Sequence, residues 1–229
     1  MVTSHESVED FLLFRSLTEA ISQEGGVEEA VRIEQRERDE FYYAFCATGR
    51  RPLLLMHVKG EQGLIRHFIQ GASIADTLVL ALPSRESLLR DDSWLFERAL
   101  IARGMGINKL VFAVVEDGPL LQTQFQKTME FVKGQLAQHA ITCTMTMTFV
   151  PVVKATGSSQ GFSNPSSVGG LQSPLWYRGK TLLQVLDDLQ AASFHVASPG
   201  QLRVLLLDAH KEHENVSLIG RVVQGSVEA

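Results

Sequence analysis

The chain has 229 residues and a net charge of −5, from 21 basic and 26 acidic side chains. Its apolar share of 45% and charged share of 21% are typical of a globular protein and exclude a disordered one. The acidic balance argues against strong autonomous nucleic-acid binding. No apolar run approaches the roughly 20 residues that span a bilayer, and the N-terminus lacks signal or transit character. We therefore expect a cytoplasmic protein that does not bind membranes.

The first part of the chain predicts two helices and two strands. Apolar residues at helical spacing over 11–21 indicate a first helix, which ends at Gly25. A second helical stretch is expected from residue 27 into the charged run 32–40, which is either a solvated helix face or a docking surface. Residues 41–47 and 53–58 are expected to pair as strands around a polar turn.

The central stretch, residues 57–76, combines a strand end, a glycine turn and a helix. The helix has an apolar face and a polar face. The apolar face comprises Leu64, Ile65, Phe68 and Ile69, and the polar face comprises Arg66, His67 and Gln70. A second apolar strand follows at 78–82. Strand, turn, helix and strand in this order predict an α/β fold, which presents ligands beyond the carboxyl ends of its strands.

The remainder of the chain continues the alternation of helices and strands. Spacing of apolar residues distinguishes the helices from the strands, and a Gly/Ser-rich composition marks one long loop. The expected segments are helices over 91–104, 125–136 and 182–189, strands over 109–115 and 142–149, a loop over 154–174, and two strand-like segments over 201–208 and 217–224. A lone two-stranded hairpin needs something to pack on.

Two motifs carry a family resemblance. Around the central helix, one set of residues keeps the spacing of D-A-P-G-H, a helix beginning R-D-F-I, and then G-T-S-Q-A-D. These residues are Gly60, Ile65, Gly71, Ser73, Ala75 and Asp76. Residues 176–183 read W-Y-R-G-K-T-L-L. Both motifs resemble the G domain of translational GTPases, above all the elongation factor 1-alpha group, which includes eukaryotic release factor 3 and the ribosome-rescue GTPases.

The resemblance implies a P-loop-GTPase-like, mostly parallel sheet with helices on both faces, followed by the start of a β-barrel domain. We expect a degenerate GTPase-like domain over 1–192, and a linker with a β-hairpin over 193–229. The match begins after the family's phosphate loop, so its first strand is expected to be missing. The strands at 53–58 and 78–82 would then pair directly, or a partner would fill the gap between them.

The positions that carry chemistry in the family have changed here. His57 replaces the aspartate on the magnesium side, and Glu61, next to the retained Gly60, replaces the histidine that positions water. Phe41 stands where a threonine reaches the magnesium ion. A phenyl ring cannot ligate magnesium, which takes hard oxygen ligands. A carboxylate at Glu61 would repel a phosphate instead of stabilising the transition state.

Guanine recognition and the phosphate cradle are altered as well. The family motif N-K-x-D is replaced at its specific positions by Val115, Glu116 and Gly118. The sequence has no G-x-x-x-x-G-K-[ST] motif, because Gly179-Lys180-Thr181 has Pro174 in place of the first glycine and lies before the last helix. Phosphoryl transfer depends mostly on positioning and electrostatics. We therefore predict that no GTP, metal or other cofactor binds.

The resulting hypothesis is a catalytically inactive pseudo-GTPase that acts as a protein-interaction module. Its partner would be a protein of translation, ribosome-associated or RNA-surveillance complexes. The docking surface is expected to include Arg36, Arg38, Arg66, His67 and Gln70. The alternative is a fragment of a GTP-binding elongation or release factor whose phosphate loop lies upstream.

Histidines and cysteines offer a third route, to an unrelated enzyme. His57, Glu61 and His67 are close enough in sequence to form a metal or acid–base cluster, although polar, solvent-exposed histidines are the favoured interpretation. Cys46 and Cys143 are distant from each other and form no metal-ligand pattern. We interpret both cysteines as buried, reduced thiols.

Overall fold

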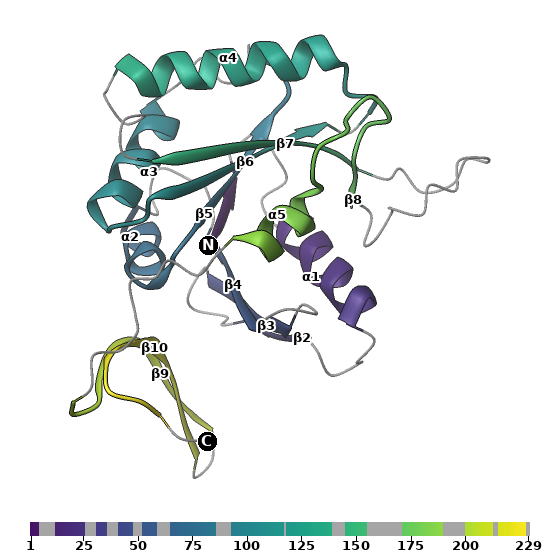
Figure 1. Cartoon of the computed structure of the whole chain (residues 1–229). Helices are drawn as coiled ribbons and strands as arrows, with labels where there is room; N and C mark the ends of the chain where they lie inside the picture. The colour runs from purple at the N-terminus through teal and green to yellow at the C-terminus, as the bar shows by residue number, and fades with distance from the viewer. Residues whose placement is uncertain are drawn as a thin grey trace.

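A computed structural model describes most of the chain (Figure 1). The described residues are 1–4, 12–25, 31–35, 41–47, 52–58, 65–85, 93–116, 118–138, 145–154, 171–189, 200–212 and 215–227. They form a large mixed sheet with helices on both faces and a separate two-stranded hairpin. Within this part of the chain, no helix is long and apolar enough to cross a membrane.

The large sheet has the strand order β2-β3-β4-β1-β5-β6-β7-β8. Its strands are β1 (Val2–Ser4), β2 (Val31–Gln35), β3 (Phe41–Ala47), β4 (Pro52–Val58), β5 (Leu78–Pro83), β6 (Lys109–Glu116), β7 (Thr146–Lys154) and β8 (Leu171–Gln172). The five strands from β4 to β7 in this order are parallel, whereas β2, β3 and β8 extend the two edges in antiparallel fashion. All of β5 is buried, as expected for a parallel strand covered on both faces.

The helices cover the sheet in two layers, each with its own apolar core. The helices are α1 (Leu12–Gly25), α2 (Ile65–Ile74), α3 (Ser93–Gly104), α4 (Gln122–Gln138) and α5 (Leu182–Asp188). One core joins α2, α3 and α4 to the sheet, with Phe68, Leu95 and Val132 among its members. The other joins α1 and α5 to the opposite face, with Phe14 and Leu186. The predicted α/β fold class with helices on both faces is confirmed.

The first strand is present, and the expectation that it is missing was wrong. Residues Val2–Ser4 form β1, which lies between β4 and β5 and is parallel to both. Val2 pairs with His57 on one side and with Val79 on the other. Strands β4 and β5 therefore do not pair directly, because β1 supplies the backbone hydrogen bonds that each would otherwise lack.

Residues 31–35 also differ from the expectation, since they form strand β2 and not a helix. Strand β2 pairs with β3 in register from Val31↔Cys46 to Gln35↔Tyr42. The sequence alternates apolar Val31 and Ile33 with charged residues, a period of two that fits an edge strand better than a helix. The charge of the surrounding run obscured this alternation.

The predicted burial of Cys46 is confirmed, whereas Cys143 lies outside the described residues. Ile69 departs from the predicted apolar face of α2, because its side chain is 41% exposed while Phe68, Gly71 and Ala72 are buried. Strand β7 begins later than predicted and continues to Lys154.

The C-terminal hairpin consists of β9 (Arg203–Glu212) and β10 (Asn215–Gln224). The two strands pair in antiparallel fashion, as predicted, with register shifts after Ile219 and Val222. The side chains of Leu202, Leu206 and Leu218 are each 50% to 57% exposed. The division of the chain at residue 192 stays a prediction.

The amine of Met1 predicts a pH dependence of stability in a chain that begins at this residue. The amine is buried and donates a hydrogen bond to the carbonyl oxygen of Thr77 at 2.8 Å, and burial lowers its pKa from 8.0 to about 5. Between these values the unfolded chain binds more protons, so the free energy of unfolding rises with pH, by roughly 4 kcal/mol over the whole window. Urea unfolding from pH 5 to pH 8 measures this rise. An Nα-acetylated chain, in which the amine cannot titrate, should lack it, and equal pH dependence in the two chains would contradict the assignment.

Candidate functional site

The carboxyl ends of the parallel strands form the edge where an α/β sheet of this kind binds its ligand. Strand β1 ends at Ser4 and is followed in the chain by residues 5–11 and then α1. These seven residues read H-E-S-V-E-D-F, with no glycine and no lysine. The loop after the central strand is where a phosphate cradle would lie. Sequence reasoning missed this position because the strand before it is only three residues long.

His57 lies near this edge on β4, and it is buried, with 1% of its surface exposed. The expectation of a solvent-exposed histidine was therefore wrong. Its ring lies 5.8 Å from that of Phe14 on α1 and 5.8 Å from that of Tyr42 on β3, both tilted against it. The side chain at the magnesium-side position is thus an aromatic ring packed between two others. Phe14 and Tyr42 were not among the predicted site residues.

Glu116, at the lysine position of the guanine-recognition motif, is bonded within the protein. The Ser84 hydroxyl, at the end of β5, donates a hydrogen bond to Oε2 of Glu116, and the Thr128 hydroxyl on α4 donates to the Ser84 carbonyl at 2.7 Å. Val115 is buried, and its carbonyl accepts a 3.2 Å bond from the Ser84 amide. Hydrogen bonds therefore connect the ends of β5 and β6 to α4, at the position where the side chains that recognise guanine lie in the family motif.

Gly118 is partly exposed, and the chain that follows it contacts a cluster of three aromatic side chains, Phe125, Trp176 and Tyr177. The indole Nε1 of Trp176 donates a 2.7 Å hydrogen bond to the carbonyl of Leu120. The rings of Phe125 and Tyr177 lie 5.6 Å and 5.9 Å from that of Trp176. Burial raises the pKa of the Tyr177 hydroxyl. These aromatic residues therefore anchor the segment before α5, a structural role.

The Gly179-Lys180-Thr181 sequence also serves a structural role. Thr181 caps the N-terminus of α5, with its hydroxyl accepting from the Gln184 amide and the Gln184 side chain accepting from the Thr181 amide. Lys180 pairs with Asp188 at 2.9 Å. In a true phosphate cradle the side chains of Lys180 and Thr181 would contact the phosphate. Here Thr181 caps the helix and Lys180 forms an ion pair with Asp188 in its last turn.

The polar face of α2 is accessible. Arg66 is exposed, and His67, Gln70 and the exposed Ile69 complete what we call the α2 surface. Beneath it, Phe68 is fully buried, and the guanidinium carbon of Arg98 on α3 lies 4.6 Å from its ring centroid. Burial lowers the pKa of Arg98. A cation stacked on a buried ring fixes the position of α2 against α3.

The remaining predicted site residues lie partly outside the described part of the chain. Gly60, Glu61, Arg36 and Arg38 fall outside it, and only the backbone of Phe41 is described, as the first residue of β3. The cluster of His57, Glu61 and His67 therefore stays a prediction. Among the described residues, no group of three histidine, cysteine or acidic side chains is placed to hold a metal ion.

The described residues do not suit a magnesium–nucleotide complex at the positions that match the family motifs. Magnesium takes oxygen ligands, and the matching position holds the ring of His57 between two other rings. The guanine reader needs a lysine and an aspartate, and the matching positions hold Glu116 and Gly118, of which Glu116 accepts a hydrogen bond from Ser84.

Sequence comparisons identify elongation factors as relatives, although no protein-family model matches the chain. The chain is 28% identical over 181 residues to elongation factor 1-alpha of Cenarchaeum symbiosum, which covers 76% of this chain and 38% of that protein. It is 26% identical over 206 residues to elongation factor 1-alpha of Desulfurococcus mucosus, covering 85% and 44%. The chain thus spans less than half the length of these relatives.

Comparison with solved structures supports the same fold. A bacterial selenocysteine-specific elongation factor matches with a TM-score of 0.57 at 13% identity, covering 98% of this chain and 34% of that one. At this identity the similarity concerns the fold alone. The chain is therefore similar in sequence to elongation factor 1-alpha, and its fold is similar to that of translational GTPases such as this selenocysteine-specific elongation factor.

Proposed function

We propose that this chain is a catalytically inactive G domain that acts as a protein-interaction module in translation, ribosome-associated or RNA-surveillance complexes. The observation that carries the proposal is the connection between β1 and α1. The strand order makes residues 5–11 the counterpart of the phosphate loop, and these residues contain Glu6, Glu9 and Asp10 but no glycine or lysine. Glycines let backbone amides wrap phosphates, and a lysine neutralises them, whereas carboxylates repel them.

The packing of the motif positions supports the same proposal. His57 is enclosed by Phe14 and Tyr42, and Glu116 is bonded to Ser84. Each of these side chains contributes to the stability of the domain by contacts within it. Phosphoryl transfer relies on positioned charges that these residues do not supply.

The α2 surface is the proposed docking site. It combines the exposed cation of Arg66 with the exposed apolar side chain of Ile69, flanked by His67 and Gln70. Arginine and a neighbouring apolar side chain are a common combination at the centre of protein interfaces. The stack of Arg98 on Phe68 holds the helix in place, which lowers the entropy lost on binding. The contributions of Arg36 and Arg38 and the cytoplasmic location stay predictions.

The alternative, a fragment of a GTP-binding factor with an upstream phosphate loop, loses support from the topology. In this sheet order the phosphate loop follows the central strand and does not precede it, and the central strand is β1. A segment before Met1 would not occupy that place.

Nucleotide binding provides the direct test. We expect no change in melting temperature when the full chain is titrated with GTP, GDP or ATP to millimolar concentration, with or without magnesium. A ligand at 100 times its dissociation constant would add roughly 2.7 kcal/mol, which a thermal-shift assay detects easily. A magnesium-dependent shift with guanine nucleotides alone would refute the proposal.

Substitution of His57 tests whether the magnesium side can be restored. His57→Asp returns the family's carboxylate to a buried position between two rings, so we expect a loss of about 3 kcal/mol in the free energy of unfolding and no gain of nucleotide binding. His57→Phe keeps an aromatic ring and should cost less than about 1.5 kcal/mol. Urea unfolding measures both effects. Magnesium-dependent GTP binding by H57D would show that the remaining pocket is functional.

Charge reversal on the α2 surface tests docking. We expect the double variant Arg66→Glu with Ile69→Asp to reduce co-sedimentation with ribosomes from the source organism by at least about tenfold, because both hot-spot side chains are lost. Lys127→Glu, on the exposed side of α4, is the matched control and should leave binding unchanged. Equal binding by both variants would exclude the α2 surface, and an absence of ribosome binding by the unaltered chain would exclude this partner.

A further inference from the structure

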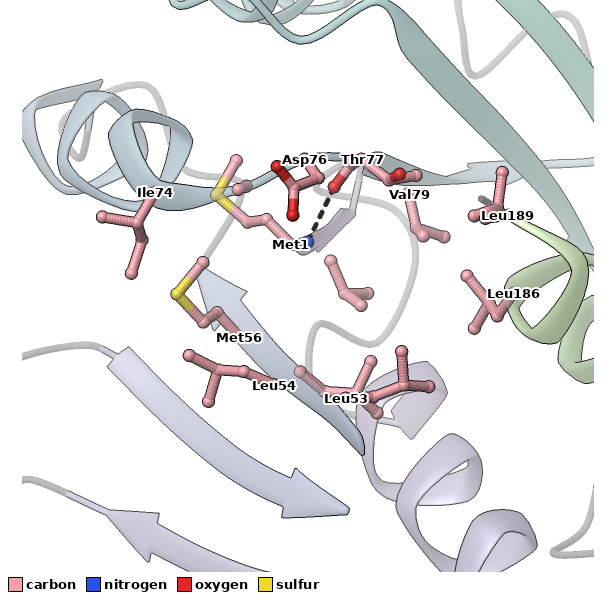
Figure 2. Close-up of a pocket in the computed structure, with 13 residues that line it drawn as sticks. Met1, Leu53, Leu54, Met56, Ile74, Asp76, Thr77, Val79, Leu186 and Leu189 are labelled. Carbon is pink, nitrogen blue, oxygen red and sulfur yellow. Dashed lines mark hydrogen bonds between the residues drawn. The ribbon is translucent and has the colours of Figure 1, made fainter. Parts of the chain in front are cut away.

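We draw no further inference here: the strongest candidate, the cavity of about 210 Å³ beside the start of β1 (Figure 2), is lined by Met1 and Asp76 as well as by leucines of β4 and α5, and nothing in the structure shows which ligand or segment occupies it.

Discussion

The structure depends on the pairing of β1 between β4 and β5. Only three residues make this strand, yet they join the antiparallel half of the sheet to the parallel half. Without them, β4 and β5 would each leave a row of backbone donors and acceptors in the middle of the domain, which is costly. The carboxyl end of this strand also fixes where a phosphate loop would lie.

At the carboxyl edge, residues at the motif positions make contacts within the protein. A histidine replaces a carboxylate and fits between two aromatic rings, and a glutamate replaces a lysine and accepts a hydrogen bond from a serine. An aromatic ring can pack between two other rings, whereas a buried carboxylate would need a cation beside it. In the proposed function, the domain keeps its outer surfaces, and these internal contacts take the place of contacts with a nucleotide. The α2 surface, held by the stack of Arg98 on Phe68, is such a surface.

Much of the fold was predictable because its signals are local. The apolar runs of β5 and β6 and the apolar spacing along α4 each reflect burial of a whole element. The contacts within the candidate site could not be predicted from such local signals. The identities at His57 and Glu116 indicated lost chemistry, but Phe14, Tyr42 and Ser84 come from other elements and were not predicted.

The sequence by itself determined the class of fold, the order of its long elements and the changed residues at the motif positions, since each of these is encoded within a few neighbouring residues. Only the tertiary structure decided that Val2–Ser4 is a central strand and that Val31–Gln35 is an edge strand. A three-residue strand has no periodicity of its own and forms because two longer strands supply its hydrogen bonds. The bond between Ser84 and Glu116, 32 residues apart, likewise exists only because β5 and β6 are adjacent.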